Sequence, residues 1–365
     1  MSVHSQFHSR GLLALMLGGG LAALASSAAA APSASPGYTL SVFAGPLAGS
    51  SAPDSIAVVG NDVFVGYGNG GAPDGSAGAM STIAEYSNSG AFINSITVAG
   101  HNDGLRYNAA SGQLWALQNE DANPNLVLLN PKTLAASAAL PFSSTPHGGG
   151  YDDIAFGAGG ATYISASNPA NNPNNQPAIV SVSLSPSQVM VNASPLLGTA
   201  AATNINTGQP TALNLQDPDS MIFAPDGRLV LDSQSDKQLV FLTHPGTASQ
   251  SVSVLNLQNE VDDTAFGDGR RERLLVADTA SGVVYSLTGV FGAGEAISAE
   301  DLAGVVGIDN LTNGDQTPLI TGLMSPHGEA LNAIPEPASW GLMLAGFFGL
   351  GSALRGLRRR GGLAL

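Results

Sequence analysis

The chain has 365 residues, no cysteine and a formal net charge of −15 at pH 7. This length allows one large or two medium domains, and without disulfides the stability must come from a hydrophobic core. The acidic balance argues against nucleic acid and anionic polysaccharide or lipid as partners, and favours divalent cations or neutral glycans.

The first 31 residues have the pattern of a secretory signal peptide. Arg10 precedes a short apolar run over residues 11–25, and small residues follow as far as Ala31. A short apolar core followed by small residues is typical of signal peptides. We therefore expect export through the Sec translocon and cleavage by signal peptidase near Ala30 or Ala31. The mature part, residues 32–334, keeps 26 of the 27 acidic residues but only 7 of the 12 basic ones, so it is more acidic than the whole chain.

A repeated unit follows the signal segment. Each copy begins with an acidic residue and continues with short apolar strands separated by turns, and the copies start at intervals of 44 to 66 residues. The leading residues are Asp54, Asp103, Asp153, Asp219 and Asp263. About four short strands in a repeat of roughly 40 to 50 residues indicate a β-propeller blade. We expect an all-β, six-bladed β-propeller over residues 32–334, with five blades as the alternative.

The two ends of the array carry the closing elements. The fifth unit is expected to run from residue 263 to 287 as one blade, and residues 325–331 resemble the start of another blade. The strand at residues 38–43 has no acidic leader, so we expect it to be an outer strand that closes the ring on the last blade. A short helical turn is expected near residues 298–302. Two long polar loops, residues 68–78 and 168–177, belong to the first and third blades.

Several segments resemble known propeller families. The stretch from Pro218-Asp219 to Asp226-Gly227-Arg228 resembles NHL-type and gluconolactonase-type propellers in the shape of its repeat. The Pro-His-Gly triplets at 146–148 and 326–328 resemble blade starts of the streptogramin lyase family, in which a central histidine carries catalysis. The gluconolactonase set of one Glu, one or two Asn and one Asp is not found at matching positions. These resemblances imply a metal-dependent hydrolase or lyase as one reading of function.

The leading acids are the candidate metal ligands. In a propeller they would ring one mouth of the central channel, where gathered carboxylates suit Ca²⁺ or another divalent cation. The metal candidates are Asp103, Asp153, Asp219 and Asp263, with Asp54, Asp152 and Asp262 at related positions. The alternative is structural, because an aspartate before an inner strand can accept hydrogen bonds from backbone amides between blades. No other cofactor is expected.

Three histidines are the candidate catalytic residues. His101, His147 and His327 occur near the starts of repeats, so we expect them at the same mouth. There an imidazole could serve as a general base or join the acids around a transition metal.

The last 31 residues carry a signal of their own. The tripeptide Pro335, Glu336 and Pro337 precedes an uncharged apolar run over residues 338–354, and the basic residues Arg358, Arg359 and Arg360 follow. The run is long enough for a short transmembrane helix, and the arginines favour a cytoplasmic C-terminus. This order resembles the PEP-CTERM sorting signal. The resemblance implies recognition by an exosortase, a membrane-embedded cysteine transpeptidase, and delivery to the cell surface.

The sequence therefore supports three hypotheses for function. The first is an exported, exosortase-processed β-propeller that acts as a binding or matrix protein in the cell envelope, on the outer surface or outside the cell. Extracellular polysaccharide or a small molecule would be its ligand. The second is a metal-dependent hydrolase or lyase, lactonase-like or streptogramin-lyase-like, with its site at the channel mouth. The third is a purely structural matrix protein.

Overall fold

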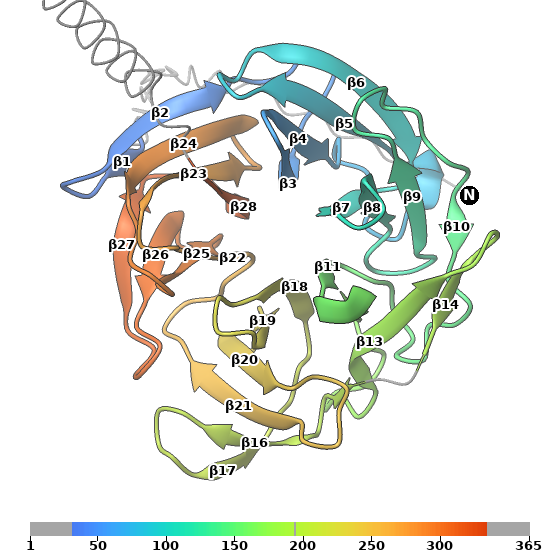
Figure 1. The fold of residues 1–365 in the computed structure, drawn as a ribbon, viewed down its shortest axis with the longest axis vertical. Helices are drawn as coiled ribbons and strands as arrows, with labels where there is room; N and C mark the ends of the chain where they lie inside the picture. Colours follow the sequence, from blue (N-terminus) through green and yellow to red (C-terminus); the bar gives the residue numbers. More distant parts are fainter. Residues whose placement is uncertain (1–30, 193–194, 334–365) are drawn as a thin grey trace, which may run out of the picture. The chain divides into compact units, whose positions relative to one another are not determined.

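Six β-sheets arranged as blades around a central axis form the fold of this chain (Figure 1). The computed structural model describes residues 31–192 and 195–333. The all-β, six-bladed prediction is confirmed, and the five-bladed alternative is excluded. The signal segment before Ala31 and the sorting tail from residue 335, with its expected helix 338–354, lie outside the described residues. Within residues 31–192 and 195–333, no helix is both long and apolar enough to cross a membrane.

Blades 1 and 2 each contain four antiparallel strands that follow one another from the centre outward. Blade 1 consists of β3 (Pro53–Val59), β4 (Asp62–Tyr67), β5 (Met80–Ser87) and β6 (Phe92–Ala99). Blade 2 consists of β7 (Asn102–Asn108), β8 (Gln113–Gln118), β9 (Asn125–Leu129) and β10 (Leu140–Pro141). A three-residue 3₁₀ helix, η1 (Ser76–Gly78), lies in the long loop of blade 1.

Blades 3 and 4 carry additional strands at their outer edges. Blade 3 consists of β11 (Ile154–Phe156), β12 (Thr162–Ser165), β13 (Pro177–Leu184) and β14 (Val189–Val191), and β15 (Leu196–Leu197) also pairs with β13. The 3₁₀ helix η2 (Ala158–Gly160) joins its first two strands. Blade 4 consists of β18 (Pro218–Phe223), β19 (Leu229–Ser233), β20 (Gln238–Thr243) and β21 (Ser251–Asn256). The earlier strands β16 (Ala201–Asn204) and β17 (Pro210–Ala212) extend it outward, with β16 parallel to β21.

Blades 5 and 6 are interleaved in sequence. The inner strand of blade 5, β22 (Thr264–Phe266), pairs with β25 (Ala296–Glu300), which continues into β26 (Val305–Asp309) and β27 (Gln316–Thr321). The intervening strands β23 (Arg271–Asp278) and β24 (Val283–Val290) belong to blade 6, whose inner strand is β28 (Pro326–Ala333). The prediction that residues 263–287 form one blade was therefore wrong. The helical turn expected near 298–302 was placed too early, because β25 continues to Glu300 and a hydrogen-bonded turn follows at residues 301–304.

Because of this exchange, the connection from β22 to β23 and the connection from β24 to β25 both cross between blades 5 and 6. They lie side by side, because the Gly267 N–H donates to Glu295 O and the Gly294 N–H donates to Gly267 O. A Cβ atom on Gly267 would lie 2.4 Å from the carbonyl oxygen of Gly292, so only glycine allows this approach.

The N-terminal strands close the ring, as predicted. β2 (Thr39–Ala44) is the outermost strand of blade 6 and pairs with β24, and β1 (Ser33–Ala34) adds to the edge of blade 5. Strands from both ends of the described chain therefore meet in blade 6, where β28 is innermost and β2 outermost.

The hydrophobic core is divided into six clusters that match the six contacts between neighbouring blades. Strand β4 shows how one strand serves two of them. Val63 and Val65 pack toward blade 6, and Phe64 packs toward blade 2, so the strand is apolar on both sides. This explains why the inner and middle strands read as continuous apolar runs.

The described part of the chain is expected to fold without the tail, because the last strand of blade 6 ends at Ala333 opposite Glu272. A protein of residues 32–334 should be soluble and unfold cooperatively, as followed by circular dichroism on heating. A protein that ends at Met324 loses β28, which leaves the inner edge of β23 unpaired, and should fail to fold. An insoluble 32–334 protein would mean that the tail belongs to the fold.

Candidate functional site

The starts of the six inner strands meet at one mouth of the central channel, and each blade places one acidic residue or histidine there. The equivalent residues, taken around the ring, are Asp54, Asp103, Asp152, Asp219, Asp262 and His327. They line a cavity of about 390 Å³. The prediction that leading acids gather at one mouth therefore describes the first five blades, and a histidine takes the position in the sixth.

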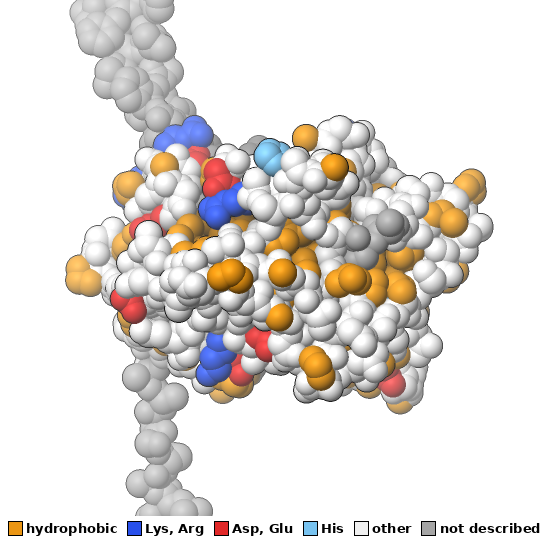
Figure 2. Space-filling view, turned by 90° about the horizontal axis from the view of Figure 1, so that it is seen from below, with side chains coloured by type: hydrophobic (Ala, Val, Ile, Leu, Met, Phe, Trp, Pro, Cys, Tyr) orange, Lys and Arg blue, Asp and Glu red, His pale blue; other side chains and the backbone are white. Residues whose placement is uncertain are grey.

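The loops after the second strand of each blade complete the wall. Because the second strand runs back toward the mouth, its following loop lies on the same face as the start of the inner strand. These loops contribute Gly68, Glu120, Asp121, Ser167, Gln234, Thr279 and Asp301. Nine carboxylate side chains and two imidazoles line the cavity, and no lysine or arginine is among its lining residues. The side of the ring seen in Figure 2 carries few charged side chains.

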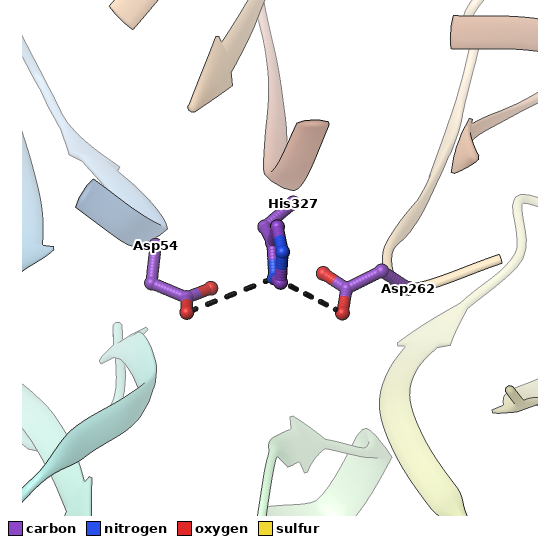
Figure 3. Close-up of side chains that lie close together, drawn as sticks. All are labelled: Asp54, Asp262 and His327. Atoms are coloured by element: carbon purple, nitrogen blue, oxygen red, sulfur yellow. Dashed lines mark ion pairs between the residues drawn. The ribbon is translucent and has the colours of Figure 1, made fainter. Parts of the chain in front are cut away.

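His327 lies between two carboxylates (Figure 3). Its Nδ1 is 3.3 Å from Asp262 Oδ1 and 3.8 Å from Asp54 Oδ2, and its Nε2 is 3.1 Å from Ser325 Oγ. Burial alone would lower the pKa of His327, but Asp262 and Asp54 outweigh it and raise that pKa to about 11. Without another cation in the mouth, His327 is therefore protonated and offsets part of the negative charge.

Two further groups of ligand atoms share Asp103. His101, Asp103 and Glu120 form one, and Asp103, Asp152 and Asp219 form the other, with the ligand atoms of each group within 4.8 Å of one another. Burial raises the pKa values of Glu120, Asp152 and Asp219 well above their usual range, and the charge of Asp103 adds to this. Burial also acts to raise the pKa of Asp103, but hydrogen bonds with Asp152 and Glu120 leave it lowered. Protons on the neighbours thus stabilise one carboxylate, a role that a metal cation can also fill.

Asp153 and Asp263 serve a structural purpose below this mouth. Arg106 Nη2 from β7 lies 2.5 Å from Asp153 Oδ2 and 3.2 Å from Asp263 Oδ1, so it links blades 2, 3 and 5. Asp153 also accepts the backbone N–H of Met221, and Asp263 that of Glu329. Asp153 and Asp263 therefore follow the structural alternative, in which a leading aspartate accepts hydrogen bonds from backbone amides between blades. Neither residue lines the cavity.

His147 lies away from the mouth. Its side chain is buried against Tyr151, with ring centroids 4.9 Å apart, and its Nε2 contacts the carbonyl oxygen of Gly150. Burial lowers the pKa of His147 to about 4, so the ring stays neutral. The Pro-His-Gly triplet at 146–148 does not bring His147 to the mouth, because the triplet precedes the leading residue Asp152 by several residues. In the triplet at 326–328, His327 itself takes the position of the leading residue. His101, two residues before Asp103, does line the cavity.

Several residues of the site were missed from the sequence. Glu120 and Asp121 follow the second strand of blade 2, and Asp301 follows the second strand of blade 5. A usable signal existed for Glu120, because loops after second strands share the face of the leading acids. No such signal existed for Asp301, because residues 298–302 were predicted as a helical turn and not as the end of a second strand. Arg106 looked like an ordinary strand residue.

Comparisons with known proteins show distant similarity to several solved structures. No protein-family model matches the sequence, and no curated protein matches it. Among solved structures, it is similar to a streptogramin B lyase (13% identity, TM-score 0.45, covering 82% of this chain and 74% of that one). A candidate gluconolactonase shows 13% identity and a TM-score of 0.45 over 80% and 83% of the two chains. A protein from Lactobacillus plantarum shows 11% identity and a TM-score of 0.47 over 78% and 89%.

Proposed function

We propose that this protein is a divalent-cation-dependent hydrolase or lyase that acts on a small carbonyl-containing molecule at the channel mouth. One observation carries the proposal: three groups of ligand atoms, two of them containing a histidine, line a single concave cavity. Acids that only joined the blades together would contact backbone amides, as Asp153 and Asp263 do.

The residues present fit a hard cation. Asp103, Asp152 and Asp219 offer only oxygen atoms, which Ca²⁺ and Mg²⁺ prefer, and the span of up to 4.8 Å between their ligand atoms allows one ion to contact all three. When bound, such a cation polarises a carbonyl oxygen as a Lewis acid. The surrounding carboxylates supply the negative charge that holds it.

His327 is the proton carrier in this proposal. It lines the same cavity, and Asp54 and Asp262 hold its Nδ1 side and stabilise its protonated form. A protonated imidazole can donate to the oxygen that leaves when an ester or lactone C–O bond breaks. In hydrolysis the oxygen of water bonds to the carbonyl carbon as the C–O bond breaks, and a proton of that water passes to an ionised carboxylate of the cavity. In elimination a carboxylate of the cavity accepts the proton from the carbon next to the breaking C–O bond, and a C=C double bond forms.

The cavity limits the substrate. Its volume of about 390 Å³ is near the lower end of the roughly 300 to 1,000 Å³ typical of small-molecule sites. Nine carboxylates without a lining lysine or arginine repel polyanions. We therefore favour a small neutral or cationic substrate. The sequence signals support the further proposal that export and exosortase processing present this site at the cell surface, with a bound extracellular molecule as its partner.

The test starts from residues 32–334 after removal of metal with a chelator. Addition of Ca²⁺ or Mg²⁺ should stabilise the protein by about 2.7 kcal/mol at a concentration 100 times the dissociation constant. The Asp103→Asn protein should need at least ten times more cation than the wild type to reach the same stabilisation. Asp226→Asn is the matched control, because it removes an acid from an exposed turn far from the cavity lining.

Turnover separates an enzyme from a binding protein. A panel of small lactones and esters would be followed by acid release for hydrolysis and by ultraviolet absorbance of a new double bond for elimination. His327→Gln should keep cation binding and lose roughly 10² to 10⁴ in kcat/KM. Cation binding without turnover on any substrate would favour the binding-protein hypothesis. No stabilisation by any divalent cation would overturn the proposal.

A further inference from the structure

We propose that the channel mouth holds two divalent cations side by side, bridged by the carboxylate of Asp103. This deepens the proposed function, since both rest on cation binding at the same mouth. One ion lies among Asp103, Asp152 and Asp219, and the other among His101, Asp103 and Glu120. Asp103 is the only residue that these two groups share, and its two carboxylate oxygens allow one contact with each ion.

The ring of His101 is held in the way that metal-binding histidines are held. Its Nδ1 lies 3.0 Å from the carbonyl oxygen of Gly71, which fixes the proton on Nδ1 in the neutral ring. Its Nε2 then carries a lone pair and lies 3.8 Å from Glu120 Oε2, which is also an acceptor. Two acceptors at this distance repel each other, and a cation between them would satisfy both.

Gly68 shows that this position of the ring is built into the fold. A Cβ atom on Gly68 would lie 2.7 Å from His101 Cε1, so the loop of blade 1 can cover the imidazole only because residue 68 has no side chain. The same loop supplies the carbonyl oxygen of Gly71. The histidine is therefore positioned by blade 1, although it belongs to the entrance of blade 2.

One side chain of these groups lacks a protein partner. Asp219 is only 8% exposed and lines the cavity, yet among the described residues its carboxylate makes no hydrogen bond or ion pair with the protein. A buried carboxylate without a partner is costly, so the position of Asp219 favours a ligand of positive charge. In the other group, Glu120 hydrogen-bonds with Asp103 through a proton, which a bound cation would replace.

The third group of ligand atoms differs from these two. His327 already forms ion pairs with Asp54 and Asp262, so the two carboxylates of this group have a positive partner from the protein. We therefore expect two ions and not three. The group around Asp219 offers oxygen atoms alone, whereas the group around His101 adds an imidazole nitrogen, and Mn²⁺ accepts both kinds of ligand.

Electron paramagnetic resonance of bound Mn²⁺ tests the bridge directly. Two Mn²⁺ ions that share a carboxylate lie close enough, at roughly 4 Å, for their spins to couple. Titration of chelator-treated residues 32–334 should give two Mn²⁺ per chain and a coupled spectrum. Glu120→Gln and Asp219→Asn should each leave one Mn²⁺ with an uncoupled spectrum. Asp103→Asn should weaken both ions at least tenfold.

Asp301→Asn is the control, because Asp301 lines the same mouth but belongs to none of the ligand groups, and it should keep two coupled ions. Circular dichroism would verify that each variant is folded, and the conservative Glu120→Asp should regain part of the second ion. One ion per wild-type chain, two uncoupled ions, or an Asp103→Asn protein that loses only one ion would overturn the bridge. One ion with turnover would still leave the proposed function standing. Two coupled ions without turnover on any substrate would instead remove the proposed function and keep the bridge.

Discussion

An Arg106→Met protein is expected to lose about 3 to 5 kcal/mol of unfolding free energy. Arg106 is the partner of Asp153 and Asp263, whose side chains are 2% and 4% exposed. Without the guanidinium, two carboxylates would remain close together in the interior with no positive partner. Urea denaturation at pH 7, followed by circular dichroism, measures the loss.

The matched control is Arg228→Met. Arg228 pairs with Asp226 in an exposed turn and lies 4.4 Å from the centre of the Phe241 ring, so its removal should cost about 1 kcal/mol or less. Adding Asp153→Asn and Asp263→Asn to Arg106→Met should restore part of the stability. The asparagine oxygens can still accept the N–H groups of Met221 and Glu329 without a buried charge. An Arg106→Met protein as stable as the control would contradict the structural assignment of this group.

The fold was largely readable from the sequence because each blade obeys local rules. The leading acid, the apolar runs and the turns predicted β3 to β14 and β18 to β21, and the strand without a leader was correctly expected to close the ring. The strands β15 to β17 were not predicted. The exchange between blades 5 and 6 was not readable, since β23 is apolar on both sides and would fit next to β22 or β28 equally well. The pairing is decided by long-range contacts, such as Thr264 with Ser298, that no local pattern shows.

The site was predictable in part for the same reason. A leading acid repeats once per blade, so its gathering at one mouth followed from the propeller symmetry. Which of two adjacent acids faces the cavity did not follow, because strands alternate and a shift of one residue reverses the direction. Asp152 and Asp262 line the cavity, while Asp153 and Asp263 contact Arg106. Asp153 and Asp263 were predicted as metal ligands ahead of Asp152 and Asp262, although nothing in their neighbours distinguishes the two members of each pair.

The second large effect concerns a buried chain of four side chains in blades 4 and 5. Thr264 Oγ1 lies 2.8 Å from Asp232 Oδ2 and 2.7 Å from Ser298 Oγ, and Ser298 Oγ lies 2.5 Å from Asp309 Oδ2. Three hydrogen bonds need three hydrogens, and the two hydroxyls supply only two. One of the end carboxyls must therefore be protonated. Burial raises the pKa of Asp309 to about 7 and that of Asp232 well above its usual range, in agreement with this count.

Asp309→Asn is therefore expected to stabilise the metal-free protein at pH 8 and to flatten its pH dependence. The folded pKa of Asp309, about 7, exceeds the value of 3.8 for a free aspartate, so the folded state binds the extra proton. Its contribution is fully present below about pH 4 and is lost as the pH rises through 7. The loss between pH 5 and 8 is about 3 kcal/mol. The asparagine amide supplies the third hydrogen at every pH, so this loss should disappear.

Urea denaturation of residues 32–334 at pH 5 and pH 8, with chelator present, gives the two free energies for each protein. The difference between the pH values should be about 3 kcal/mol smaller for Asp309→Asn than for wild type. Asp226→Asn removes the same charge from an exposed turn and should leave the wild-type difference unchanged. Equal pH dependence in Asp309→Asn and wild type would mean that Asp309 is ionised in the folded state. The third hydrogen would then have to come from Asp232, the other end of the chain, and Asp232→Asn would be the variant that flattens the profile.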